Sequence, residues 1–339
     1  MVWRTSSVSQ DKRSLRFGDL PPIGMITVSS GFITVELIAA MVQRYSRHME
    51  LKGAICFLVI NKIEELPELA VRSALSESSM DVYIGYTQIK DIQNLLISDR
   101  VHPIDLSTHL VQERQDLEYK DFSSAEFYEI IQLKWSLFEE LLPNFDFLVY
   151  SDVDVIWLRD AGRYVSDVFH SNPDIDFLVQ GFTEVVGNEM LCMGFAAVRK
   201  NERTIEFIKG CRSSHREAHI SNRFIGDDDI VTGQFHSLSR PSWIKELPQM
   251  FFPVGRMLNL YGTKPIFPGL AAPEPYIFHL NFVVGLTNKR LMLRLLRKLK
   301  PVSALLVNSY FRFWRVVLFL KCVRLKLGTL KKNSLLKRL

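Results

Sequence analysis

The sequence has few of the features that mark an exported or membrane-spanning protein. Its first twenty residues contain no apolar stretch of the length that a signal peptide or membrane anchor requires. The chain has only 4 cysteines, none in C-x-x-C spacing, and none of its asparagines begins an N-x-S/T sequon. We therefore expect a cytoplasmic protein without a signal peptide or transmembrane anchor.

Acidic residues are missing from the end of the chain, where basic residues are abundant. No Asp or Glu follows Glu274, and 15 of the 42 Lys and Arg residues lie in the segment 289–339. The other 27 basic residues stand against 37 acidic ones, so the preceding body is acidic and the C-terminal segment strongly basic. This asymmetry predicts a tail that binds an anionic surface.

The chain nevertheless has the composition of a globular protein, with 47% apolar residues among 339 and a mean hydropathy of +0.06. Strand-like and helix-like segments alternate along it. We expect strands at 24–30, 53–61, 81–87, 145–149, 175–182, 191–200 and 275–283, and helices at 32–45, 65–78, 123–142 and 201–213. This alternation predicts an α/β fold with a mostly parallel central sheet and helices on both faces.

Two carboxylates, Asp152 and Asp154, directly follow the apolar segment FDFLVYS. Neighbouring carboxylates at the end of a buried strand cost free energy unless a positive group lies between them. In an extended chain, residues two positions apart face the same side, so this pair can hold a hard divalent cation that also binds a diphosphate. The alternative is a solvated pair of aspartates that caps a turn.

The segment SDVDVIWLRD (151–160) resembles the signature of the nucleotide-diphospho-sugar transferases of the GT-A fold, in the group that includes plant arabinosyl- and xylosyltransferases. The resemblance extends from about Gly24 to Lys289. It implies a Rossmann-related sandwich that transfers a sugar from a nucleotide-diphospho-sugar to a glycan or lipid-linked acceptor, with retention. It also implies that Asp152 and Asp154 bind Mn²⁺ or Mg²⁺, which neutralises the departing diphosphate.

The resemblance continues in FHLNFVVGLTNKR (278–290). It implies that His279 is a third metal ligand, that Gly285 lets the backbone approach the phosphates, and that Lys289 neutralises one phosphate. A histidine in an apolar strand can instead be a core residue with its hydrogen bonds satisfied.

Other donor contacts are implied by position. Lys134 lies in the expected helix before the D-x-D strand, where relatives carry a basic residue near the nucleotide-sugar; a solvated lysine on the helix surface is the alternative. Thr27 and Ser29 lie where relatives cradle the nucleoside. Gly194 matches the glycine of an N-x-G-F motif, although Cys192 stands in the place of its asparagine.

The acidic triplet in GDDDIV (226–231) matches a loop that lies beside the reacting carbon in the resembled enzymes. Asp228 and Asp229 are therefore candidate catalytic residues that orient the acceptor or stabilise oxocarbenium charge. The alternative is a helix N-terminus rich in aspartate for reasons of the helix dipole. Asp228 replaces a family glutamine and Thr232 a family asparagine. With Cys192, Asp228 favours a rival hypothesis, a catalytically inactive, membrane-associated binding protein of the same fold.

The basic tail contains NKRLMLRLLRKLK (288–300), whose apolar and basic residues fall on opposite helical faces, and an apolar segment, 304–327, interrupted by basic residues. This pattern predicts an interfacial helix on anionic lipid. A packed core helix is an alternative. Nucleic acid is not an expected partner, because no recognition motif accompanies the charges.

We thus expect a polar extension (1–22), a glycosyltransferase domain (23–288) and a tail (289–339) that attaches the protein peripherally to membranes. Metal-dependent phosphoryl transfer is disfavoured, because the chain has no P-loop.

Overall fold

The computed structural model of the chain describes residues 51–60, 65–110, 128, 130–181, 190–221, 223, 225–249, 251–254, 275–281, 289–290 and 293–294. The chain divides into two units, Met1–Glu50 and Leu51–Leu339, and all described residues belong to the second. The expected strand 24–30 and helix 32–45, with Thr27 and Ser29, lie outside the described residues, as do Gly285 and most of the tail.

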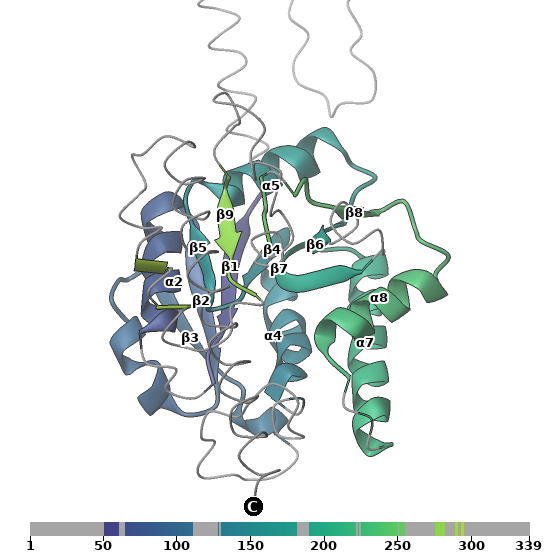
Figure 1. Cartoon of the computed structure of the whole chain (residues 1–339), viewed down its shortest axis with the longest axis horizontal. Coiled ribbons are helices and arrows are strands. Elements are labelled where there is room, and N and C mark those ends of the chain that lie inside the picture. Colours follow the sequence, from purple (N-terminus) through teal and green to yellow (C-terminus); the bar gives the residue numbers. More distant parts are fainter. Residues whose placement is uncertain are drawn as a thin grey trace, which may run out of the picture. The chain divides into compact units, whose positions relative to one another are not determined.

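A seven-stranded sheet forms the centre of the described unit (Figure 1). Its strand order is β3-β2-β1-β4-β7-β6-β8, with β7 antiparallel to both of its neighbours and the other adjacent pairs parallel. In this order the strands are β3 (Val101–Asp105), β2 (Asp81–Tyr86), β1 (Gly53–Leu58), β4 (Phe147–Ser151), β7 (Leu191–Arg199), β6 (Phe177–Gly181) and β8 (Ile244–Glu246). The predicted α/β class with a mostly parallel sheet is confirmed.

Helices cover both faces of this sheet, because the buried strands β1 and β4 present apolar side chains to both sides. On one face, Ala54 and Leu148 belong to a core that includes residues of α4 (Leu133–Leu141), α7 (Glu202–Ile220) and α8 (Asp227–Ser237). On the other face, Ile55 and Phe147 belong to a core with α2 (Leu66–Glu77) and α5 (Ala161–Ser171). Successive strand residues face opposite sides, so one apolar run supplies both cores.

Side-chain caps explain where two of the helices begin. The Asp160 carboxylate accepts a hydrogen bond from the backbone N–H of Arg163 at the start of α5 (2.9 Å). Asn201 and Thr204 form a capping box at the start of α7. The expected helix 123–142 is described from Leu133 to Leu141 as α4, and the turn that follows contains Pro143.

A second, two-stranded sheet pairs β5 (Val155–Trp157) antiparallel with β9 (Ile277–His279). It lies directly after β4, the middle strand of the large sheet, and brings a segment from late in the chain to that strand's carboxyl end. Ligands bind at the carboxyl ends of strands in open α/β sheets. The fold therefore places the D-x-D segment where a ligand site is expected.

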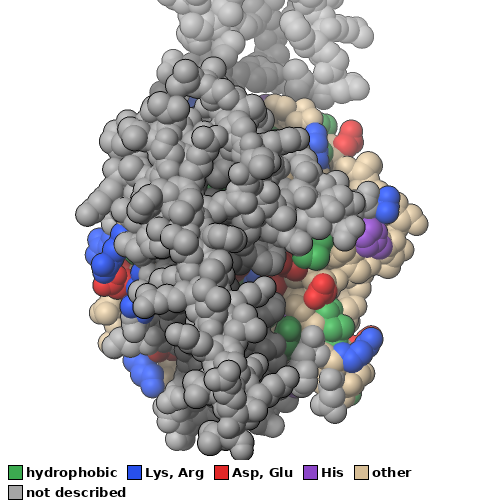
Figure 2. Space-filling model, in the orientation of Figure 1, with side chains coloured by type: hydrophobic (Ala, Val, Ile, Leu, Met, Phe, Trp, Pro, Cys, Tyr) green, Lys and Arg blue, Asp and Glu red, His purple; other side chains and the backbone are tan. Residues whose placement is uncertain are grey.

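The described surface is mixed in charge. On the face that Figure 2 shows, basic and acidic side chains of the described residues occur close to one another. Among the described residues, no helix combines the length and apolar character needed to cross a bilayer.

Candidate active site

Asp152 and Asp154 lie in a tight turn between β4 and β5, where the backbone N–H of Val155 donates to the carbonyl of Asp152 (3.1 Å). We expected the two side chains to face the same side because the chain would be extended here. The chain turns instead, so that explanation is wrong. The turn itself brings the two carboxylates together. Asp154 is buried, whereas the Asp152 side chain is 34% exposed, so this pair of aspartates is open to solvent on one side only.

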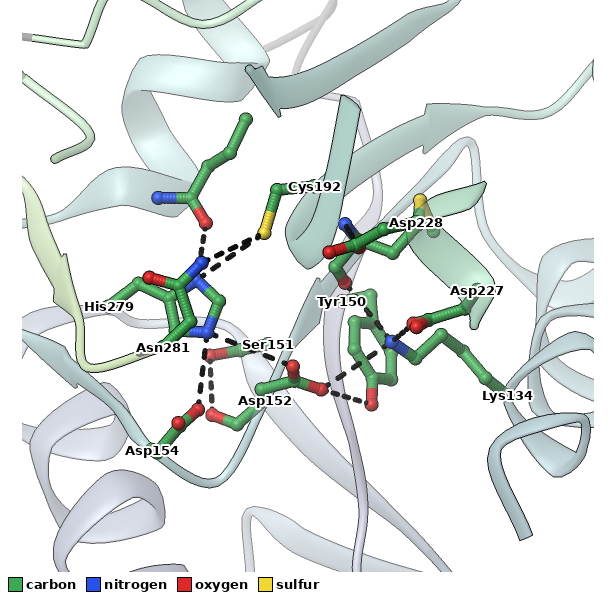
Figure 3. Close-up of polar contacts among 12 residues, drawn as sticks. Lys134, Tyr150, Ser151, Asp152, Asp154, Cys192, Asp227, Asp228, His279 and Asn281 are labelled. Carbon is green, nitrogen blue, oxygen red and sulfur yellow. Dashed lines mark hydrogen bonds and ion pairs between the residues drawn. The ribbon is translucent and has the colours of Figure 1, made fainter. Parts of the chain in front are cut away.

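His279 reaches this turn through strand pairing. It is the register partner of Val155 in the β5–β9 sheet, and the next residue, Leu280, donates its backbone N–H to the carbonyl of Asp154 (3.0 Å). His279 Nε2 lies 3.3 Å from Asp154 Oδ1 and 3.9 Å from Asp152 Oδ2 (Figure 3). Two segments about 125 residues apart in sequence thus form a single group of side chains.

The three residues fit a divalent cation. One possible ligand atom from each of Asp152, Asp154 and His279 lies within 4.8 Å of the other two. Two carboxylates and an imidazole are a donor set suited to a divalent metal, and the exposed side of Asp152 leaves room for further oxygen ligands. Among the described residues, no other group of three such side chains meets this spacing.

Lys289 contacts the same turn from the first residues of the predicted tail. Its Nζ lies 2.5 Å from Asp154 Oδ2, so Asp154 contacts His279 with one oxygen and Lys289 with the other. Burial alone would raise the pKa of Asp154, but Lys289 and His279 outweigh burial and hold that pKa well below its usual range. Asp154 is therefore ionised at neutral pH, as a carboxylate ligand of a cation must be.

Lys134 lies beside Asp152 on the other side, and it is buried rather than solvated. Its ammonium forms an ion pair with Asp227, lies 3.5 Å from Asp152 Oδ1, and donates to the carbonyl of Met193 (3.2 Å; Figure 3). Burial lowers the pKa of Lys134, but Asp152 and Asp227 raise it by more, so the lysine stays charged. The alternative of a solvated surface lysine is wrong.

The acidic triplet forms the first turn of α8, as the helix-terminus alternative expects. Asp227 and Asp228 nevertheless also contact other elements. Asp227 pairs with Lys134, and Asp228 Oδ1 accepts from the backbone N–H of Met193 in β7 (2.6 Å). Burial and the neighbouring Asp227 raise the pKa of Asp228 to about 7. Asp229 is exposed. The triplet thus supplies one ion-paired carboxylate, one that titrates near neutrality and one in solvent.

Gly194 lies against His279. A Cβ at position 194 would lie 1.9 Å from His279 Cε1, so only glycine leaves space for the imidazole. The Gly194 carbonyl accepts from the backbone N–H of Asp152 (2.8 Å).

Cys192 is buried nearby, with its Sγ 3.7 Å from His279 Nδ1 and 3.4 Å from Asn281 Nδ2. Thr232, in the family's asparagine position, accepts from the backbone N–H of Leu191 (3.0 Å).

Three polar residues of the site were missed by sequence reasoning. Asp227 was passed over for the next two aspartates of its triplet. Tyr150 was read only as part of an apolar strand, but its hydroxyl donates to Asp152 Oδ1 (2.8 Å). Gln180 is buried and contacts His279. Its signal was available, because it is the one polar residue of the described strand FLVQG.

Comparisons with known proteins give the chain a family context. A family model described as nucleotide-diphospho-sugar transferase matches residues 91–293, which include the D-x-D turn, His279 and Lys289. One solved structure that matches is the apo form of mouse xyloside xylosyltransferase 1, at 10% sequence identity and a TM-score of 0.44, over 68% of this chain and 97% of that one. No curated protein matches the chain.

Proposed function

The chain belongs to the nucleotide-diphospho-sugar transferase family, and from that premise we propose that it is a metal-dependent glycosyltransferase whose cation, Mn²⁺ or Mg²⁺, is held by Asp152, Asp154 and His279. One observation carries the proposal. The turn after β4 and the strand β9 bring two carboxylates and an imidazole within 4.8 Å of one another. They lie at the carboxyl end of the middle strand of the sheet, where ligands bind in open α/β folds.

The chemistry requires stabilisation of a leaving group. The bond between the anomeric carbon and the donor's diphosphate breaks, and the acceptor's hydroxyl oxygen bonds to that carbon. The proton of that hydroxyl leaves with the nucleoside diphosphate. Asp152, Asp154 and His279 would hold a divalent cation, which would supply neutralisation of charge on the departing oxygens. Lys289, at 2.5 Å from Asp154, is placed to add a second positive charge there.

The other charged residues are proposed to bind the sugar. Lys134 and Asp227 form an ion pair beside Asp152. The lysine can donate hydrogen bonds to sugar hydroxyl groups, and the carboxylate can accept hydrogen bonds from them. Asp228, which is held by the Met193 N–H through one oxygen, keeps its second oxygen for the acceptor or for positive charge on the anomeric carbon. Asp229 remains a candidate for acceptor contact, and Gly285, Thr27 and Ser29 remain proposed donor contacts. Retention of configuration is proposed from the family resemblance.

The test measures products directly. The protein is incubated with a panel of nucleotide-sugars, candidate glycan acceptors and Mn²⁺, with or without a chelator, and products are identified by mass spectrometry and their anomeric configuration by NMR. We expect chelator-sensitive transfer that Asp152→Asn and Asp154→Asn each reduce at least about 100-fold, because charge neutralisation at the leaving group is lost. Asp167→Asn, which changes an exposed carboxylate of α5, is the matched control. Chelator-resistant transfer, or equal activity in all three variants, would exclude the metal role.

A further inference from the structure

We infer that Gln180 is a positioning residue that fixes the tautomer of His279 and thereby sets the affinity and selectivity of the cation site. The inference deepens the proposed function and rests on it. Gln180 lies on β6, is fully buried, and has both ends of its side-chain amide bonded. Because each bond has only one chemically allowed direction, the arrangement of protons follows from the contacts.

The first bond orients the amide. Gln180 Nε2 lies 3.1 Å from the backbone carbonyl oxygen of Phe252, and a carbonyl can only accept a hydrogen bond. The NH₂ group of Gln180 must therefore face Phe252, and its Oε1 must face the other way. That oxygen lies 2.9 Å from His279 Nδ1.

The second bond orients the proton of the imidazole. Gln180 Oε1 can only accept, so His279 Nδ1 must carry hydrogen and donate it. In a neutral imidazole with hydrogen on Nδ1, the lone pair is on Nε2. Nε2 is the nitrogen that faces the carboxylates, at 3.3 Å from Asp154 Oδ1. The chain of bonds from Phe252 thus keeps hydrogen on Nδ1 and leaves Nε2 as the nitrogen whose lone pair can bind a cation.

Other contacts keep the ring in this position but do not replace Gln180. Gly194 limits the space on one side, where any Cβ would collide with the imidazole. Cys192 Sγ lies 3.7 Å from Nδ1, but sulfur is a weak acceptor at a longer distance. Gln180 is therefore the stronger acceptor for Nδ1–H.

The expected consequence is selectivity between cations. Imidazole nitrogen suits transition metals, whereas Mg²⁺ prefers oxygen ligands. A correctly oriented Nε2 should strengthen Mn²⁺ binding far more than Mg²⁺ binding. Residues that orient a ligating histidine typically change metal affinity about 10- to 100-fold when they are replaced.

The experiment compares Gln180→Met with Gln249→Met. Gln249 is a second buried glutamine near the same strand, and its Nε2 donates to the carbonyl of Gly181 (2.8 Å) rather than to the site. The dissociation constants of Mn²⁺ and Mg²⁺ are measured calorimetrically on the metal-free protein without a donor, beside thermal melting. We expect Gln180→Met to weaken Mn²⁺ binding about 10- to 100-fold and Mg²⁺ binding less than about threefold. Gln249→Met should leave both dissociation constants within twofold. Gln180→Glu keeps an acceptor for Nδ1–H but loses the donor to the Phe252 carbonyl, so it should bind Mn²⁺ more tightly than Gln180→Met does.

The controls separate this inference from the proposed function. His279→Ala and Asp154→Asn should lose Mn²⁺ binding in any case if the cation site is correct. If they lose it while Gln180→Met does not, or while Gln180→Met and Gln249→Met lose it equally, the positioning role is wrong. If none of these variants loses Mn²⁺ binding, the proposed cation site itself is wrong. Should Gln180→Met fail to fold, Gln180→Asn, whose shorter amide cannot reach His279, gives the same comparison.

Discussion

Gly194 and the imidazole of His279 are in direct contact, since a Cβ at position 194 would lie 1.9 Å from His279 Cε1. Gly194→Ala should therefore displace the imidazole and weaken Mn²⁺ binding by about tenfold or more, as the loss of a correctly oriented ligand does. Gly233→Ala in α8 is the control, because an added Cβ there meets no described atom within 4 Å and alanine favours the helix. Calorimetric Mn²⁺ titration of both variants checks this. Unchanged affinity in Gly194→Ala would show that the ring has other space.

The buried ion pair of Lys134 and Asp227 should dominate stability near the site. Lys134→Met leaves Asp227 without its counter-ion, and breaking such a buried pair typically costs about 3 to 5 kcal/mol of unfolding free energy. The double variant Lys134→Met/Asp227→Asn should recover much of this loss, because no unpaired charge of the pair remains.

Urea denaturation of the metal-free single and double variants measures this coupling. Arg163→Met removes an exposed pair with Asp167 in α5 and should cost less than about 1 kcal/mol. If Lys134→Met costs no more than Arg163→Met, or if the double variant is no more stable than Lys134→Met, the ion pair does not hold α8 against the site.

Continuous apolar runs made much of the fold predictable. β1, β2, β4, β6 and β7 were expected within a few residues, because buried strands of an α/β sheet are apolar on both faces. β3, with the sequence VHPID, was missed, since its alternating burial and Pro103 give it no such run. The three-residue β8 is too short to leave a pattern.

The site was predictable where its residues form a local motif and not where contacts are long-range. The D-x-D pattern indicated Asp152 and Asp154, the family resemblance added His279 and Lys289, and the structure brings all four together. Gln180 and Asp227 have their contacts because β6 and α8 pack beside β7, across the chain. No local pattern encodes those distances, although an isolated glutamine in an apolar strand is a usable signal.

Asp228 should give stability a characteristic pH dependence. Its pKa is raised in the folded state to about 7, by burial and Asp227, above about 3.9 for an unperturbed aspartate. The folded state therefore favours the protonated form, and the stabilising contribution is complete below the unfolded pKa and lost as pH rises through about 7. Asp228→Asn, which cannot ionise, should gain melting temperature relative to the native protein between pH 5 and pH 8. Thermal melts in chelator at four pH values test this, and a constant difference would contradict it.

Replacing Lys289 should weaken diphosphate binding without weakening metal binding. Removing its ammonium frees Asp154, so Lys289→Ala should bind Mn²⁺ alone as well as or better than the native protein. Binding of inorganic diphosphate with Mn²⁺ should weaken about 10- to 150-fold, the value of a charge-assisted contact of about 1.5 to 3 kcal/mol. Arg294→Ala, which removes an exposed pair with Glu65, is the control and should change diphosphate affinity less than twofold. Equal effects of the two variants would mean that Lys289 acts only through general charge.

We propose that the basic tail attaches the protein to anionic membranes and brings it to a lipid-linked acceptor. Its first turns belong structurally to the body, because Leu293 is fully buried and Arg294 pairs with Glu65. A truncation must therefore keep these residues, and ending the chain after Pro301 does so while removing the whole apolar segment 304–327 and nine of the 15 basic residues.

The full chain should sediment with vesicles that contain phosphatidylserine and be partly released by high salt, because each basic residue near an anionic surface contributes about 1 kcal/mol. The truncated chain should stay in solution and keep its activity on a small soluble acceptor, while activity on a lipid-linked acceptor falls. Equal binding of the full chain to neutral and anionic vesicles would remove the electrostatic part of this proposal. If the truncated chain instead unfolds or aggregates, the tail is part of the hydrophobic core and the membrane role is wrong.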